Sequence, residues 1–209
     1  MISIEISVPI GRGHSLKGNL DIPSMPNSVV IFSDCKGRAN QDNRYLVNML
    51  NNHGIATFFP DLLTREEVNG YDNQYNIDLL SERLFAVTNY AVHLRNLYNL
   101  PAGFIGSGTG AATAIRVAAW SPSLVRAMVL NGARIDLAGN SLKIVKQPTL
   151  LIADEGDAEL VKLNQYPFIQ LTCEKEFRII ENSKRLNKTG ELAVQWFAKY
   201  LSLPSQQAA

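Results

Sequence analysis

The stretch PAGFIGSGTGAATAIRVAA, from Pro101 to Ala119, predicts a strand, a sharp turn and a helix in direct succession. AGFIG is a short apolar run, typical of a strand that is buried on both faces of a sheet. TGAATAIRVAAW is rich in small residues that a helix accepts. The glycine-rich segment 106–110 joins the two, and glycine is the residue that best tolerates a tight backbone turn.

Similar segments surround this one along the chain. The pattern predicts buried strands at 28–34 and 55–61, further strands at 125–132, 148–154 and 176–182, and helices at 41–52, 77–98 and 191–201. Alternating strands and helices are typical of an α/β fold, here with a mostly parallel central sheet flanked by helices on both faces.

The ends of the chain differ from this central pattern. Residues 2–8 and 16–22 alternate as two antiparallel N-terminal strands joined by a glycine turn. We expect one domain over 1–203 and a disordered tail at 204–209. Ligand sites in such sheets lie at the carboxyl ends of the strands, which directs attention to the loops that follow them.

Composition excludes several classes of function. Hydrophobic residues make up 46% and charged residues 19% of the 209 residues, and the net charge is +1. No basic stripe predicts nucleic-acid binding, and no run of about 18 apolar residues predicts a membrane span. Cys35 and Cys173 form no CxxC pair, so we expect no metal or cofactor, reduced thiols and a cytoplasmic location.

The glycine spacing decides which residue of the turn occupies a nucleophile's place. In a nucleophile elbow the positions two before and two after the nucleophile must be small, because the chain turns so tightly there. Taking Ser107 as the nucleophile puts β-branched residues at both flanks, whereas position 108 has glycine at both. The spacing therefore assigns the nucleophile's place to Gly108, which has no side chain.

A phosphate-binding glycine loop is the competing interpretation of the same segment. Bare amides at a helix start attract anions. The spacing is not GxGxxG, however, because the third glycine would fall on Ala111, and the GK[ST] ending of a P-loop is absent. A dinucleotide loop also follows the first strand of its sheet, and this segment follows a late one.

Several stretches carry a resemblance to a known family. They are Asn43-Arg44, PDLLTREE (60–67), GSGTGAATA (106–114), ARIDLAG (133–139), PTLLIADEGD (148–157) and IIENSKRL (179–186). With these stretches the chain resembles, over nearly its whole length, the dienelactone-hydrolase-like group of the α/β-hydrolase superfamily. The resemblance implies the α/β-hydrolase fold and hydrolysis of an ester or lactone by a Ser or Cys nucleophile with His and Asp.

Carried over to this chain, the family's catalytic triad is degenerate. Its nucleophile falls on Gly108, its acid on Asp157, and its histidine on Arg185 or the neighbouring Lys184. Glycine supplies no nucleophile, and arginine stays protonated and accepts no proton. The resemblance thus implies a pseudo-hydrolase that binds a small ligand or a protein partner without catalysis. An engineered Gly108 is an alternative, although one deliberate change would not also explain Arg185.

The predicted cleft collects polar side chains from the strand ends. Its members are Asp34, Cys35, Lys36, Ser107, Gly108, Thr109, Asp157 and Arg185. Asp157 either pairs with Arg185 or is a solvated loop carboxylate.

An active hydrolase with a rebuilt site is the alternative function. Its nucleophile would be Cys35, activated by Lys36, or Ser107. The competing interpretations are an inert thiol and a hydroxyl that bonds locally within the turn. The oligomeric state stays open, and so do the identities of ligand and partner.

Overall fold

The computed structural model describes residues 1–11, 13–33, 41–181 and 185–202, which form one eight-stranded sheet. Its strand order is β1-β2-β4-β3-β5-β6-β7-β8. The strands are β1 (Ile2–Gly11), β2 (His14–Ile22), β3 (Ser28–Phe32), β4 (Ile55–Pro60), β5 (Ala102–Ser107), β6 (Ala127–Ala133), β7 (Thr149–Asp154) and β8 (Lys175–Ile180).

The sheet is antiparallel at its start and parallel thereafter. β1 pairs antiparallel with β2, and β2 pairs antiparallel with β4. From β4 through β3, β5, β6 and β7 to β8, every neighbouring pair is parallel. The predicted fold class, with antiparallel N-terminal strands, is therefore confirmed.

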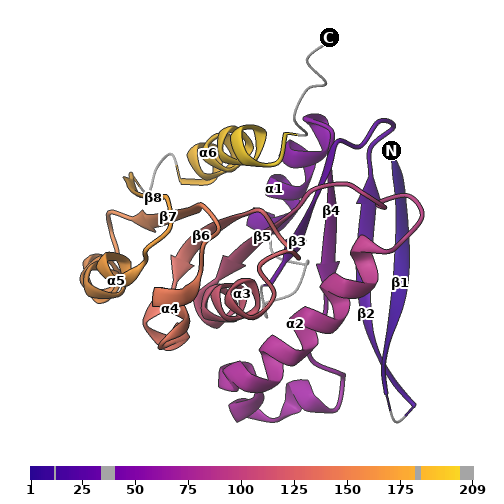
Figure 1. The fold of residues 1–209 in the computed structure, drawn as a ribbon, viewed down its shortest axis with the longest axis horizontal. Helices are drawn as coiled ribbons and strands as arrows, with labels where there is room; N and C mark the ends of the chain where they lie inside the picture. Colours follow the sequence, from indigo (N-terminus) through magenta and orange to yellow (C-terminus); the bar gives the residue numbers. More distant parts are fainter. Residues whose placement is uncertain (12, 34–40, 182–184, 203–209) are drawn as a thin grey trace.

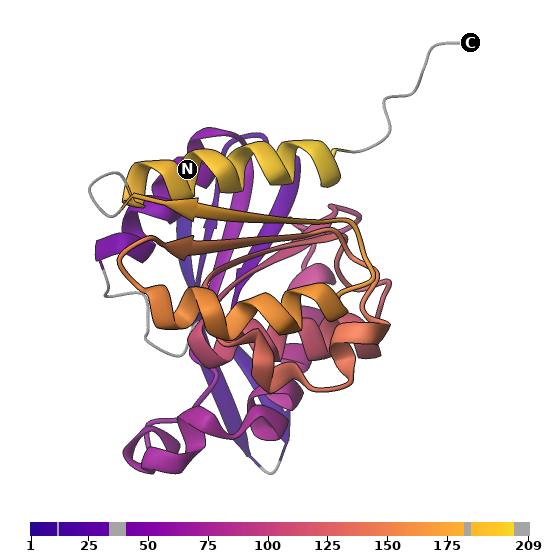
Figure 2. The ribbon, with the colours of Figure 1, turned by 90° about the vertical axis from the view of Figure 1, so that its left-hand side faces the viewer.

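Helices cover both faces of the sheet (Figures 1 and 2). One face carries α1 (Gln41–Asn52) and α6 (Arg185–Tyr200), and the other carries α2 (Ile77–Val92), α3 (Gly108–Trp120), α4 (Ser141–Ile144) and α5 (Ala158–Gln170). The core is accordingly split into two buried clusters, one on each side of the strands. The helices α3 and α5 both begin at the carboxyl ends of parallel strands, where the site is expected.

Several helices differ from the sequence-based expectation: α4 was not predicted, and α6 begins at Arg185 and not at residue 191. The helix predicted at 77–98 ends at Val92, because turns between residues three apart follow it and Asn99 takes a φ of 64°. The helix α5 was not expected at all, and it contains Pro167 near its end. The predicted tail 204–209 lies outside the described residues.

No helix in the described part of the chain combines the length and the apolar character needed to cross a bilayer.

Candidate functional site

The turn between β5 and α3 has its left-handed residue at position 108. Gly108 has a φ of 50°, whereas Ser107 is extended, with φ −134° and ψ 156°. A left-handed backbone is unfavourable for residues that carry a Cβ, and a nucleophile elbow places its nucleophile at such a strained position. Gly108 therefore stands at the bend, and Ser107 is the residue before it.

The surroundings of the two glycines explain the tightness of the turn. A Cβ at Gly106 would lie 2.7 Å from Ser33 Oγ and 2.9 Å from Ala111 Cα, whereas a Cβ at Gly108 would meet nothing within 4 Å. Ser33 is fully buried, and its hydroxyl oxygen lies within hydrogen-bond distance of two carbonyls, that of Gly110 at 2.8 Å and that of Ile105 at 3.2 Å. Position 106 thus excludes side chains, and position 108 has room for one.

The polar segment 64–76, which precedes α2, contacts the start of α3. The Thr109 hydroxyl donates to the Gln74 carbonyl at 3.0 Å. Within that segment Thr64 and Glu67 bond reciprocally, with Thr64 N donating to Glu67 Oε2 at 2.8 Å and Glu67 N donating to Thr64 Oγ1 at 3.3 Å. This is the geometry of a capping box. Thr64 and Glu67, the first and last residues of TREE (64–67), thus stabilise a turn in the same segment whose Gln74 contacts the start of α3.

Glu67 also bonds to Arg83 of α2 at 3.0 Å, which gives a prediction for stability against pH. Burial disfavours the charged carboxyl, but Thr64 and Arg83 outweigh it and lower the pKa of Glu67. A carboxyl whose pKa is lowered in the folded state stabilises the fold at pH values above the ordinary glutamate pKa. This contribution is lost as the pH falls through the pKa of the folded state. We expect Glu67→Gln to reduce the unfolding free energy at neutral pH by about 1 kcal/mol.

Urea titrations at several pH values would measure this effect. The difference between wild type and Glu67→Gln should shrink toward acidic pH. The control is Glu66→Gln, because Glu66 is an exposed neighbour in the same segment. Equal losses in the two variants would contradict the assignment.

An ion pair lies next to Gly108 at the end of β6. Arg134 N donates to the Gly108 carbonyl at 3.0 Å. The Arg134 guanidinium binds both carboxylate oxygens of Asp136, each at 2.9 Å, and this bidentate pairing raises the pKa of Arg134. Sequence reasoning gave neither residue a role in the site. The Arg-x-Asp pattern directly after a buried strand was the available signal.

Asp157 has a structural task at the start of α5. Its carboxylate accepts a hydrogen bond from Leu160 N at 3.0 Å and caps the helix, and the residue is exposed. An aspartate in this place is a common helix N-cap. The ion pair with Arg185, one of the two alternatives for Asp157, involves a side chain outside the described residues. Arg185 itself is the first residue of α6.

The remaining cleft candidates lie in segments that the structure does not describe. These are Asp34, Cys35 and Lys36, and the same holds for Lys184, the alternative to Arg185 at the family's histidine position. The structure thus brings together Ser107, Gly108 and Thr109 with the Arg134–Asp136 pair and leaves the other side of the predicted cleft undescribed.

None of the three histidines lies beside the turn. His53 follows α1 and His93 follows α2, and each ring donates through Nδ1 to a carbonyl at its own helix end. Both precede strands, so they lie at the amino edge of the sheet, opposite Gly108. His14 begins β2, which is three strand positions from β5. That separation is about 14 Å, far beyond hydrogen-bond reach.

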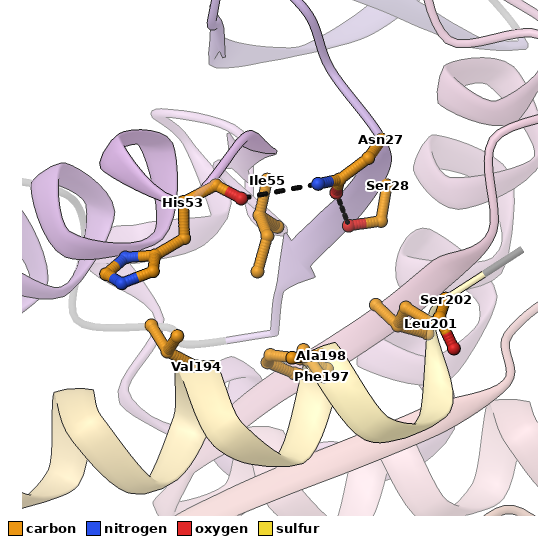
Figure 3. Close-up of a pocket in the computed structure, with 9 residues that line it drawn as sticks. All are labelled: Asn27, Ser28, His53, Ile55, Val194, Phe197, Ala198, Leu201 and Ser202. Carbon is orange, nitrogen blue, oxygen red and sulfur yellow. Dashed lines mark hydrogen bonds between the residues drawn. The ribbon is translucent and has the colours of Figure 1, made fainter.

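A cavity of about 360 Å³ lies at the amino edge, between the end of α1 and α6 (Figure 3). It contains both a serine and a histidine, but they do not form a catalytic pair. The Ser28 hydroxyl donates to Asn27 Oδ1 at 2.8 Å, and the Asn27 amide donates to the His53 carbonyl at 3.3 Å. Its walls are mainly apolar, as Ile55 and Phe197 illustrate. The cavity therefore offers packing surface, not acyl-transfer chemistry.

Among the residues that the structure describes, nowhere do three or more His, Cys, Asp or Glu side chains gather in a way that would hold a metal ion.

Solved structures similar to this one include several hydrolases. A dienelactone hydrolase from Anabaena variabilis is 33% identical, with a TM-score of 0.89 over 96% of this chain and 98% of that one. The esterase domain of a Rhodothermus marinus protein is 18% identical, with a TM-score of 0.77 over 97% and 100%. Est1E from Butyrivibrio proteoclasticus is 12% identical, with a TM-score of 0.73 over 93% and 99%. The last two likenesses concern the fold alone.

Two curated relatives carry a different name. They are putative phosphoribosyl transferases from two strains of Mycobacterium tuberculosis, each 35% identical over 196 residues. The match covers 90% of this chain but 44% of each relative, so the chain spans less than half of their length. No family model matches the chain.

Proposed function

Because this chain belongs to the dienelactone-hydrolase-like group of the α/β-hydrolase superfamily, we propose that it is a non-catalytic member that binds a small molecule or a protein partner. The observation that carries this proposal is the turn at residue 108. Its left-handed position, with room for a side chain, holds glycine. Acyl transfer through a covalent intermediate needs a nucleophilic atom there, and Gly108 offers only hydrogen.

The segment before α6 supports the same proposal. A general base near the nucleophile needs a pKa close to the working pH, which histidine provides and arginine does not. The sequence has no histidine between Glu181 and Arg185. Two of three triad groups are absent together, and a triad loses several powers of ten in rate when any one is removed.

An active hydrolase with a rebuilt site is the alternative. Ser107 is partly exposed at the end of β5, and its side chain does not cap α3. Its hydroxyl is therefore the substitute nucleophile that this alternative would use. Cys35, the other candidate, lies outside the described residues.

Esterase assays separate these two functions. We expect the wild-type protein to show no turnover of p-nitrophenyl esters above background and no labelling by a fluorophosphonate or iodoacetamide probe in the cleft. Turnover that Ser107→Ala or Cys35→Ala abolishes would overturn the non-catalytic proposal. The same result would establish the rebuilt hydrolase.

A reconstructed triad tests the positional assignment. The double variant Gly108→Ser with Arg185→His restores a hydroxyl and an imidazole at the family positions. We expect it to hydrolyse p-nitrophenyl esters at least about tenfold faster than Gly108→Ala with Arg185→His, since general-base assistance alone contributes about a hundredfold or more. The second variant is the matched control, because it differs only by the oxygen of residue 108.

A binding screen would identify the class of ligand. The names of the two curated relatives make phosphosugars and nucleotides reasonable probes, beside lactones and esters. A compound that binds only the folded protein at a hundred times its Kd stabilises it by about 2.7 kcal/mol, which thermal-shift measurements detect.

A further inference from the structure

The strand β1 is an open edge of the sheet. It is the outermost strand in the order β1-β2-β4-β3-β5-β6-β7-β8, and β2 pairs with one side of it (Figure 1). In the described ranges no strand pairs with its other side. Backbone N–H and C=O groups on such an edge are available to a further strand.

One face of β1 is apolar along its length but only partly covered. Ile6 and Val8 are buried under α2, with 8% and 1% of their surface exposed. Ile4 and Ile2 continue the same face, and 41% and 58% of their surface is exposed. Burying such side chains is favourable by about 25 cal/mol per Å² of apolar surface. The N-terminal half of this strand therefore has apolar surface that a neighbour would cover.

A groove accompanies the exposed half of the strand. It has a volume of about 490 Å³ and runs between β1 and the end of α2, with Ile4, Ile6, Leu20, Tyr90 and Leu94 among its walls. Side chains of a strand project alternately to the two faces of its sheet. A strand added to β1 would thus point every second side chain toward the α2 side, where this groove lies.

The opposite edge of the sheet is protected in a way that β1 is not. β8 carries charged side chains, and Arg178 forms a salt bridge with Glu176 at 2.7 Å. Charges on edge strands hinder pairing with other chains. Between residues 2 and 8, β1 has a single charged residue, Glu5, and Lys17 of its own sheet pairs with it at 2.8 Å.

We propose that β1 pairs with β1 of a second copy of this chain, antiparallel about a two-fold axis at Ile4. In this register Ile4 lies opposite its own equivalent, and Ile2 lies opposite Ile6 of the second copy. Ser3 then faces Glu5 of the second copy. A register centred on Glu5 would oppose two carboxylates, which is unfavourable.

The same strand segment serves both copies, so the contact closes as a dimer and does not continue into a fibre. The eight-stranded sheets would join into one sheet across the axis. This inference is independent of the proposed function, because β1 lies at the sheet edge away from Gly108.

Light scattering coupled to size-exclusion chromatography tests the dimer. We expect the wild-type protein to have twice the 23.1 kDa mass of one chain, and Ile4→Lys to have the mass of one chain. The matched control is Ile179→Lys, because Ile179 is 54% exposed on the other edge strand, β8. The control should keep the doubled mass. A wild-type protein with the mass of one chain, or equal dissociation of both variants, would overturn the proposal.

Cross-linking tests the register and does not depend on how a lysine variant folds. In a chain whose Cys35 and Cys173 are replaced by serine, Ile4→Cys should form an intermolecular disulfide when oxidised glutathione takes up the two electrons. Directly opposed Cα atoms in antiparallel strands lie about 4.5–5.5 Å apart, within the range of a disulfide. Ser3→Cys, which would face Glu5, should cross-link at least about tenfold less. Equal yields would refute this register.

Discussion

Replacing Gly106 by valine is expected to reduce the unfolding free energy by about 3 kcal/mol, because the side chain has no space. Its Cβ would stand 2.7 Å from Ser33 Oγ and 2.9 Å from Ala111 Cα. The second of these is a backbone atom of α3 and does not move without moving the helix. Urea-induced unfolding followed by circular dichroism would measure the loss.

Gly108→Ser is the matched control, two residues along the same turn. Its Cβ would meet nothing within 4 Å, so only the φ of 50° opposes it. We expect this variant to lose about 1–2 kcal/mol. A larger loss for Gly108→Ser than for Gly106→Val would contradict the geometry of the turn.

A second change separates the two clashes at Gly106. Adding Ser33→Ala to Gly106→Val removes the nearest atom, Ser33 Oγ, but leaves the contact with Ala111. The loss of unfolding free energy in the double variant should therefore be smaller than the sum of the two single losses, but it should not vanish. Such a coupling is measured by a double-mutant cycle. Strict additivity would show that Ser33 does not press on position 106.

Phe104→Ala should also reduce the unfolding free energy strongly, by about 4 kcal/mol, because it leaves a cavity in the core beside a central strand. Phe104 lies in β5, and none of its surface is exposed. It belongs to the buried cluster on the α2–α3 side, and its strand leads into the turn that carries Gly108. For a chain of this length such a loss corresponds to a fall in Tm of roughly 10 °C.

Phe85→Ala provides the comparison for this prediction. Phe85 lies on α2, and 39% of its surface is exposed. Its truncation leaves no closed cavity, and we expect a change within about 0.5 kcal/mol. Differential scanning calorimetry on both variants would show the contrast, and similar melting temperatures would contradict the assignment of Phe104 to the core.

Much of the fold was predictable because local patterns and burial agree. The apolar run before Gly106 is a strand, and the small residues after it form α3. The expected helix over 77–98 was too long, however. Leu94 and Leu97 continue the apolar spacing, but the backbone turns after Val92 and passes through Asn99 at a positive φ. Side-chain periodicity indicates which residues are buried, but it does not show which backbone hydrogen bonds form.

The helix α5 illustrates a missed local signal. The resemblance assigns Asp157 to the family's acid position, and this assignment stays a prediction. An aspartate three residues before a backbone N–H also predicts a helix N-cap, which is the signal that the sequence offered for α5. The structure places its carboxylate on Leu160 N. Pro167 further obscured the pattern, since proline inside a helix removes a backbone hydrogen bond.

The α/β class and the position of the sharp turn could be inferred from the amino-acid sequence without coordinates. Both depend on short-range constraints: the alternation of buried segments, and glycines at fixed spacing around Gly108. Only the tertiary structure revealed Arg134 against Gly108, Glu67 against Arg83, and the uncovered edge at β1. The two contacts join residues that are separated in the chain, and the open edge follows from strand order; no local pattern encodes either.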